Sequence, residues 1–214
     1  MSFYPDCEII ECEQRTPEWF EARRGLLTAS EFGAWLIKQT TATEKKAFEN
    51  AISRCVSRTA GAFEPKVYEN EAMTRGTELE PEAVAAFEKA TGNLVKEVGF
   101  CRSLKGLFGC SPDGLILGKN EGFEGKVPIG PTHVKYRRAG ELPSEYIYQV
   151  HGCMAVTGAD HWHFQSYQPG LASLRVCIDR DETTEKILKG LLLFSDALEE
   201  ALEEEAKAWR SEYE

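Results

Sequence analysis

A change in hydrophobic periodicity near Leu94 is the feature that most constrains the fold of this chain. Before it, apolar residues recur at helical spacing, and helices are predicted at 17–23, 43–60 and 78–91. The cap-like segment Thr28-Ala29-Ser30-Glu31 predicts one more helix, which would carry Phe32, Trp35 and Leu36.

From Leu94 onward the period approaches two, which is typical of β-strands. Strands are predicted at 94–102, 107–110, 114–117, 122–127, 161–167 and 173–178. The turn-forming residues 118–122 join two of these strands into a hairpin. Further helices are predicted at about 143–157 and 181–210. This order predicts an α/β or α+β fold, with a central mixed β-sheet flanked by helices.

The chain has 214 residues, which suits one sizeable core, and it shows no internal repeat or linker. We expect a single domain over 1–214, with a helical part at about 1–93, a sheet core at about 94–178 and an acidic helix at about 181–214. A hydrophobic content of 42% argues against disordered and fibrous classes.

No apolar run reaches the roughly 20 residues that a membrane-spanning helix needs. Residues 1–14 contain acidic residues, whereas a secretory signal has basic residues followed by an apolar run. We therefore expect no membrane partner. The seven cysteines contain no CxxC pair, which predicts neither a disulfide framework nor a zinc finger. They suit a reducing cytoplasm as buried, small hydrophobic residues.

The net charge of −10 argues by itself against a nucleic-acid partner. The charge is segregated, however, because residues 199–214 hold seven glutamates against two basic residues. Residues 125–140 contain no acid and four basic residues, Lys126, Lys135, Arg137 and Arg138. The stretch 126–138 is therefore a candidate DNA-tracking surface, with a solvated loop as the alternative.

The sequence Ser111-Pro112-Asp113-Gly114 and the later Glu124-Gly125-Lys126 contain the most informative polar residues. On a strand, Glu124 and Lys126 share a face, and a hairpin lets Asp113 approach Glu124. Two carboxylates and an ammonium suit phosphodiester hydrolysis, because the acids can hold Mg²⁺ while the lysine positions or deprotonates water. The alternative is an ordinary turn followed by an exposed hairpin face, and these residues alone do not decide between the two.

Further segments accompany this pair in a fixed order. They are 14–25 (QRTPEWFEARRG), 27–30 (LTAS), 75–81 (RGTELEP), Asp113 with Glu124 and Lys126, and 148–150 (YQV). Over about residues 14–168 the series resembles the lambda-type phage exonucleases, also described as YqaJ-like viral recombinases or alkaline exonucleases.

The resemblance implies a restriction-endonuclease-like α/β core. It implies a Mg²⁺-dependent enzyme with two metal ions, for which Mn²⁺ can substitute, that digests one strand of linear double-stranded DNA from 5′-phosphorylated ends. The expected products are 3′ single-stranded overhangs for recombination by strand annealing. The expected partners are a phage single-strand annealing protein and two further copies in a homotrimer, in the cytoplasm of a bacterium that carries the phage or prophage.

The resemblance also assigns roles to particular residues. The implied metal ligands are Glu80, Asp113, Glu124 and the carbonyl of Gly125. Lys126 matches the catalytic lysine, and Gln149 matches a glutamine that helps to hold the lysine or water. The implied pocket for the terminal 5′ phosphate contains Arg23, Thr28, Ser30 and Ser111.

Several alternatives remain open at this point. Glu80 could favour the first turn of its helix through the helix dipole, Thr28 and Ser30 could be helix caps, and Gln149 could be an ordinary polar helix residue. His161 and His163 share a strand face but have no third ligand in view, so they are left out of the site.

The chain also departs from the family at Gly125, where an aliphatic residue is usual, at Val127, where cysteine is common, and at His151, where a second glutamine is frequent. The first departure puts the rate in question more than the activity. The rival functions are an endonuclease or single-strand exonuclease on the same core, and a DNA-end binding module with weak catalysis.

Overall fold

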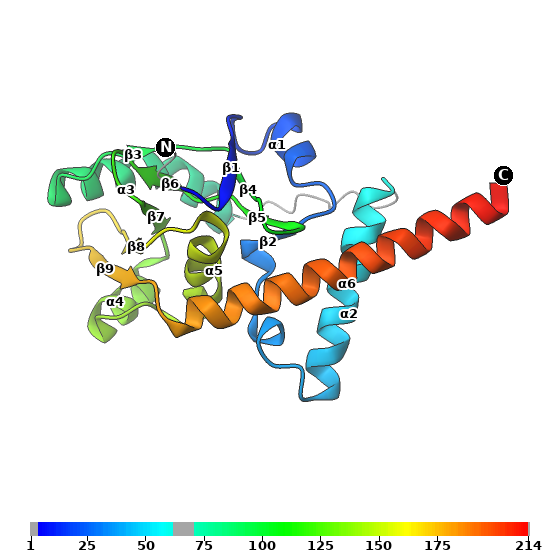
Figure 1. The fold of residues 1–214 in the computed structure, drawn as a ribbon. Coiled ribbons are helices and arrows are strands. Elements are labelled where there is room, and N and C mark those ends of the chain that lie inside the picture. The colour runs from blue at the N-terminus through cyan, green and yellow to red at the C-terminus, as the bar shows by residue number, and fades with distance from the viewer. Residues whose placement is uncertain (1–3, 62–70, 214) are drawn as a thin grey trace.

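The computed structural model describes residues 4–61 and 71–213, with side chains from residue 74 onward in the second range (Figure 1). Its α-helices are α1 (Pro17–Ala22), α2 (Ala42–Thr59), α3 (Glu71–Thr91), α4 (Gly130–Ala139), α5 (Ile147–Thr157) and α6 (Glu182–Tyr213). Three short 3₁₀ turns are η1 (Ala29–Glu31), η2 (Ala34–Leu36) and η3 (Ser144–Tyr146). The first residues of the expected domain and Glu214 lie outside the described residues.

The strands form two sheets. The first has the order β1-β4-β5-β2 and contains β1 (Cys7–Ile10), β4 (Phe100–Ser103), β5 (Phe108–Cys110) and β2 (Leu27–Thr28). The second has the order β3-β6-β7-β8-β9 and contains β3 (Val95–Lys96), β6 (Gly114–Ile116), β7 (Glu121–Lys126), β8 (His161–Ser166) and β9 (Leu174–Asp179). Both sheets mix parallel and antiparallel pairs, which confirms the α/β class with mixed β-structure flanked by helices.

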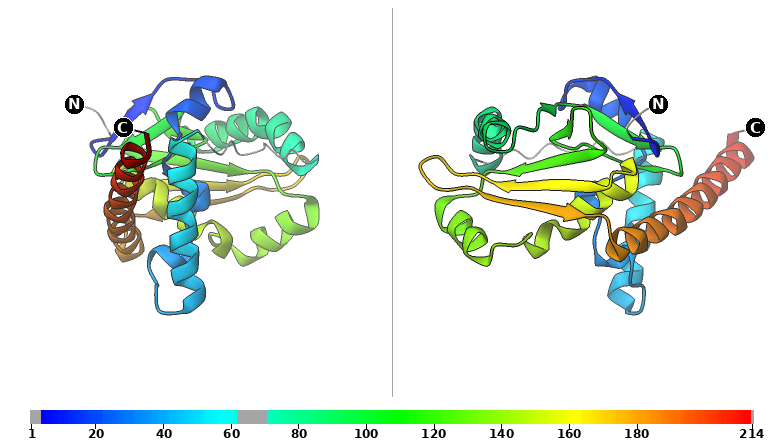
Figure 2. Two further views of the ribbon diagram at one scale, coloured as in Figure 1. Left: turned by 90° about the vertical axis from the view of Figure 1, so that its right-hand side faces the viewer. Right: turned by 60° about the vertical axis from the view of Figure 1, so that its left-hand side comes forward.

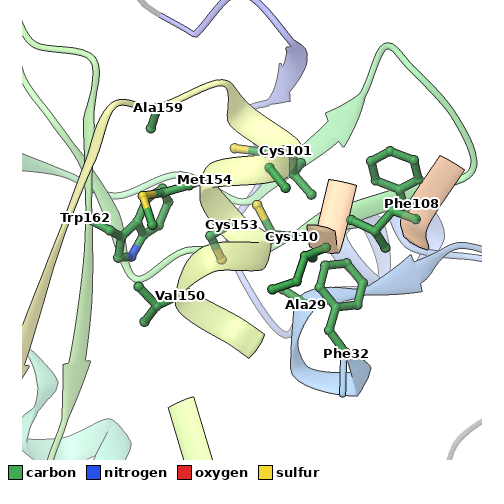
Figure 3. Packing of buried hydrophobic residues seen from close by; sticks show 14 of the residues in the cluster. Ala29, Phe32, Cys101, Phe108, Cys110, Val150, Cys153, Met154, Ala159 and Trp162 are labelled. Atoms are coloured by element: carbon green, nitrogen blue, oxygen red, sulfur yellow. The ribbon is translucent and has the colours of Figure 1, made fainter. Parts of the chain in front are cut away.

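Helix α5 forms the centre of the core. Its side chains Val150, Cys153 and Met154 are fully buried. They lie between Trp162 of β8 and Cys110 of β5 (Figure 3). Helix α3 lies on the other side of the five-stranded sheet from α4 and α5 (Figure 2). One apolar core therefore joins the two sheets through a single helix.

Several sequence-based expectations about the first half of the chain are wrong. The helix predicted after Thr28 is two 3₁₀ turns separated by extended Gly33 (φ −161°), and Thr28 makes no capping hydrogen bond. The part expected to be helical, 1–93, also contributes strands β1 and β2. The strand predicted at 94–102 divides into β3 and β4, which belong to different sheets.

The basic segment after β7 contains helix α4 rather than a loop. Pro131 stands in its first turn, and Gly140 ends it in the left-handed conformation (φ 72°). His133 fixes the helix to the sheet, because its Nδ1 lies 2.8 Å from Ser166 Oγ and its Nε2 lies 2.9 Å from the Ala172 carbonyl. Polar ring nitrogens make this contact, so a search for apolar periodicity does not detect the helix.

Helix α6 packs against the core through its first half, where Ile187, Leu191, Phe194 and Leu198 are fully buried. Beyond Glu199 its residues are largely exposed, and the helix projects from the body (Figure 1). The apolar face of this helix thus belongs to the core, and its acidic end is solvated. No helix in the described ranges is long and apolar enough to cross a bilayer.

Candidate active site

The hairpin β6–β7 brings the expected acidic residues together. Gly114 pairs with Phe123, so Asp113, just before β6, lies beside the following residues of β7. Its Oδ2 accepts a hydrogen bond from the Gly125 backbone N–H at 2.8 Å. This bond fixes the Asp113 carboxylate next to Glu124.

Glu124 is fully buried, and its two oxygens have different environments. Lys126 Nζ and Gln149 Nε2, the latter at 2.7 Å, both donate hydrogen bonds to Oε1. Oε2 has no hydrogen-bond partner among the described residues. A buried carboxylate oxygen without a partner is costly in a folded protein, and a cation is the ligand that satisfies it best.

Glu80 adds a third carboxylate from α3. Burial and the neighbouring charge of Asp113 raise its pKa to about 7. Burial, Asp113 and Glu80 likewise raise the pKa of Glu124 to about 7, although Lys126 opposes the shift. The three acids therefore repel one another in a poorly hydrated site, which is the electrostatic condition that a divalent cation relieves.

The ordinary interpretation of Glu80 as a first-turn residue is wrong, because α3 begins at Glu71 and places Glu80 in its interior. Arg75 of the same helix donates hydrogen bonds to the carbonyls of Val127 and Pro128, the first at 2.7 Å. These bonds fix α3 against the end of β7. Arg75 thus anchors the helix that carries Glu80.

Lys126 stays charged in this setting. Burial would lower its pKa, but the carboxylates of Glu124 and Asp113 outweigh burial and raise the pKa above its ordinary value. The ammonium also lies 5.4 Å from the ring centroid of Tyr146, within cation–π range. Lys126 is therefore a fixed positive charge at the edge of the acidic cluster.

The residues expected to form a phosphate pocket also come together. Arg23 Nη2 donates to Thr28 Oγ1 at 3.1 Å, and Thr28 Oγ1 lies 3.4 Å from Ser30 Oγ. The Arg23 guanidinium stacks 3.9 Å above the Trp19 ring, whose Nε1 donates to Ser111 Oγ at 2.8 Å. Trp19 thus connects Arg23 to Ser111, a link that the sequence interpretation missed.

Helix capping does not explain Thr28, because its hydroxyl instead donates to Glu31 at 3.2 Å. Arg58 neutralises this carboxylate with two bonds of 3.0 Å. Arg24 turns outward to pair with Glu21 at 2.8 Å. The inward guanidinium is therefore that of Arg23, and burial lowers its pKa to about 10.

The remaining basic candidates, Lys135, Arg137 and Arg138, lie on α4 and are exposed. None of the three forms an ion pair with another described residue. Helix α4 contacts β8, whereas Lys126 of the same basic stretch points into the acidic cluster.

The site and the fold have clear relatives. The YqaJ-like viral recombinase domain matches residues 18–160 of the chain. The alkaline exonuclease LHK-Exo from Laribacter hongkongensis is 33% identical, with a TM-score of 0.74, and the match covers 92% of this chain and 99% of LHK-Exo. The chain belongs to the YqaJ-like viral recombinase family.

LHK-Exo has also been crystallised in complex with dAMP, and that structure matches with the same identity, coverage and TM-score. A phage-related exonuclease from Haemophilus somnus 129PT has a TM-score of 0.61 at 14% identity, over 86% of this chain and 98% of its own, and it supports the fold alone. No curated protein matches the sequence significantly. The core is thus the restriction-endonuclease-like fold of phage-type exonucleases.

Two departures from the YqaJ-like pattern have structural explanations. At Gly125, an added Cβ would lie 3.1 Å from the ring of Phe123, which already fills the space above this residue. His151 lies 2.8 Å from Thr184 Oγ1 and joins α5 to α6. The backbone carbonyl of Gly125 does not depend on the side chain at this position.

Proposed function

We propose that this chain is a Mg²⁺-dependent 5′-to-3′ exonuclease. It digests one strand of linear double-stranded DNA and leaves 3′ single-stranded overhangs for phage-type recombination by strand annealing. The observation that carries the proposal is the Glu124 carboxylate, held at Oε1 by Lys126 and Gln149 and left without a partner at buried Oε2. The likeness to the alkaline exonuclease LHK-Exo supports it.

The donor set fits Mg²⁺, with Mn²⁺ as a substitute. Glu80, Asp113, Glu124 and the Gly125 carbonyl would hold two ions, and all four offer the oxygen ligands that these hard cations prefer. Burial and the charge of Asp113 raise the pKa values of Glu80 and Glu124, and bound cations would offset both effects. When bound, such ions would stabilise the negative charge that develops on the phosphate and would make water easier to deprotonate.

Lys126 and Gln149 have distinct roles in the proposed mechanism. Because Lys126 stays protonated, it donates a hydrogen bond to the attacking water or to a phosphate oxygen, and its charge favours the transition state. Gln149 fixes the Glu124 carboxylate, so the free oxygen keeps one direction. Both residues are positioned before substrate arrives.

The pocket beside the acidic cluster favours an end-dependent enzyme. Ser111 contributes to the pocket and Asp113 to the cluster, and only Pro112 separates them, a backbone distance of at most about 7 Å. A terminal phosphate held by Arg23, Thr28, Ser30 and Ser111 would bring a phosphodiester near the strand end to the cluster. Charge-assisted hydrogen bonds suit that dianion.

The deciding experiment measures nucleotide release in Mg²⁺ from three duplexes: one with 5′-phosphorylated ends, one with 5′-hydroxyl ends and one closed circle. We expect rapid release from phosphorylated ends only, and loss of release in Glu124→Ala. Glu78→Ala, which removes an exposed carboxylate of α3, is the matched control and should act like the wild type.

Other outcomes would replace the proposal. Cutting of the circle would identify an endonuclease, and preference for a single-stranded substrate would identify a single-strand exonuclease. Binding of phosphorylated ends without release of nucleotides would identify an end-binding module.

We further propose that the enzyme acts as a homotrimer in the bacterial cytoplasm, together with a phage single-strand annealing protein. Membership of the family supports these assignments. Light scattering of the purified protein tests the trimer, and a mass of one or two chains would refute it.

A further inference from the structure

A second group of metal-ligating side chains lies on the five-stranded sheet, outside the candidate active site. His161 of β8 and Cys177 and Asp179 of β9 each offer one ligand atom, and these atoms all lie within 4.8 Å of one another. The group is accessible, because the His161 side chain is 44% exposed and Cys177 and Asp179 are exposed. Cys177 is exposed and Cys12 is partly buried, so these two cysteines depart from the expectation that the cysteines are buried.

Strand register explains why these residues meet. His161 pairs with Asp179 and His163 pairs with Cys177 across the β8–β9 ladder. Since alternate residues of a strand share a face, these four side chains form a patch on one side of the sheet. His161 Nδ1 lies 2.8 Å from Asp179 Oδ1.

The patch is separate from the acidic cluster. In the parallel β7–β8 pair, His161 lies opposite Glu121, three residues before Glu124, which is about 10 Å along the strand. Glu121 and Glu124 also point to opposite faces of the sheet, because side chains alternate. A cation at the patch would therefore not share ligands with the proposed Mg²⁺ centre.

Of the two histidines in the patch, His161 is the one that is free to bind a cation, because His163 is held by other residues. His163 Nε2 lies 2.7 Å from Glu121 Oε2, and its ring lies 5.3 Å from the ring of Phe87 on α3. His163 is thus held by its own partners, whereas His161 is half-exposed and has a carboxylate and a thiol beside it.

The ligand chemistry selects the cation. An imidazole nitrogen, a thiolate and a carboxylate together favour a borderline-soft divalent ion such as Zn²⁺, whereas Mg²⁺ favours oxygen ligands alone. Three protein ligands leave a fourth tetrahedral position for water. Histidine is apt here because neutral imidazole binds the metal directly.

We propose that His161, Cys177 and Asp179 bind one Zn²⁺-class cation at the edge of the sheet. Within the described part of the chain, β9 pairs only with β8, so such a cation would cross-link the edge strand to its one neighbour. The proposal goes beyond the nuclease function and does not depend on it.

Titration with Co²⁺, in the presence of excess Mg²⁺ to occupy the acidic cluster, tests the proposal. We expect one equivalent of Co²⁺ to produce a thiolate-to-cobalt charge-transfer band. Cys177→Ser should abolish the band, and Cys12→Ser, which changes a partly buried cysteine on another part of the fold, should retain it. His161→Ala should weaken Co²⁺ binding by at least roughly tenfold.

A second measurement uses stability instead of absorbance. Zn²⁺ should raise the thermal midpoint of the wild type and of Cys12→Ser, but not that of His161→Ala or Asp179→Asn. The proposal is overturned if the wild type shows no thiolate band, if the band survives Cys177→Ser, or if Zn²⁺ shifts the midpoints of all variants equally. Neither readout depends on DNA cleavage, so the result is independent of the proposed nuclease.

Discussion

Replacement of Glu124 by glutamine should remove a pH-dependent loss of stability from the metal-free protein while it abolishes nuclease activity. The Glu124 carboxyl is fully buried, and burial together with Asp113 raises its pKa from an ordinary 4.5 to about 7. Folding therefore favours the neutral, protonated form. Glutamine has nearly the same shape and is neutral at every pH, so it mimics that form.

The size of the effect follows from the pKa difference. Each unit corresponds to about 1.4 kcal/mol, so a shift from 4.5 to about 7 corresponds to about 3 kcal/mol. Because the pKa is raised in the folded state, the wild type has this stabilisation in full below pH 4.5 and loses it as pH rises through 7. Glu124→Gln does not lose it.

Urea unfolding of both proteins in a chelator, from pH 5 to pH 8.5, measures this difference. The free energy of unfolding of Glu124→Gln minus that of the wild type should increase by roughly 2 to 3 kcal/mol across this range. Glu78→Gln, at an exposed carboxylate of α3, should show no comparable trend. A difference between Glu124→Gln and wild type that does not change with pH would refute the reasoning.

Three further predictions concern DNA. Lys126→Ala should lower nucleotide release by roughly 10²- to 10⁴-fold while duplex affinity, measured by fluorescence anisotropy, persists; release at the wild-type rate would exclude Lys126 from catalysis. Trp19→Phe keeps a ring below Arg23 but loses the hydrogen bond to Ser111. It should reduce the preference for phosphorylated over hydroxyl ends by up to about tenfold in release assays, and an unchanged preference would contradict the pocket. Replacing Arg137 and Arg138 by alanine should flatten the slope of log affinity against log salt by up to about 2, whereas an equal slope would show that α4 does not touch phosphate.

The sequence predicted the elements whose signals are local. Helix α2 begins and ends within a residue or two of its expected bounds, because its apolar residues recur at helical spacing, and Thr41 and Glu44 form a capping box at its start. The β6–β7 hairpin was also predicted, since its turn is rich in polar residues and glycine. Strands β1 and β2 were missed because they are short and pair with β4 and β5, which lie far away in the sequence.

The site residues also divide into those predicted from local patterns and those that local patterns do not reveal. Strand alternation placed Glu124 and Lys126 on one face, and the hairpin brought Asp113 to them. The likeness to a family was needed for Glu80 and Gln149, because helices α3 and α5 deliver these residues from distant parts of the chain. Trp19 carried no recognisable signal, since its role depends on the contacts of one indole nitrogen.

Pro112, the single residue between Ser111 and Asp113, fixes the spacing between the candidate phosphate pocket and the acidic cluster. Pro112 restricts its own backbone, and its carbonyl accepts a hydrogen bond from Gln14 Nε2 at 2.9 Å, while the same amide group donates to the Val98 carbonyl at 3.0 Å. Gln14, which lies outside the β6–β7 hairpin, therefore restrains the spacing between the candidate pocket and the acidic cluster. In the proposed exonuclease, an insertion at this point should lengthen the distance between the bound terminal phosphate and the cleaved bond, and the size of the released fragment would measure this change.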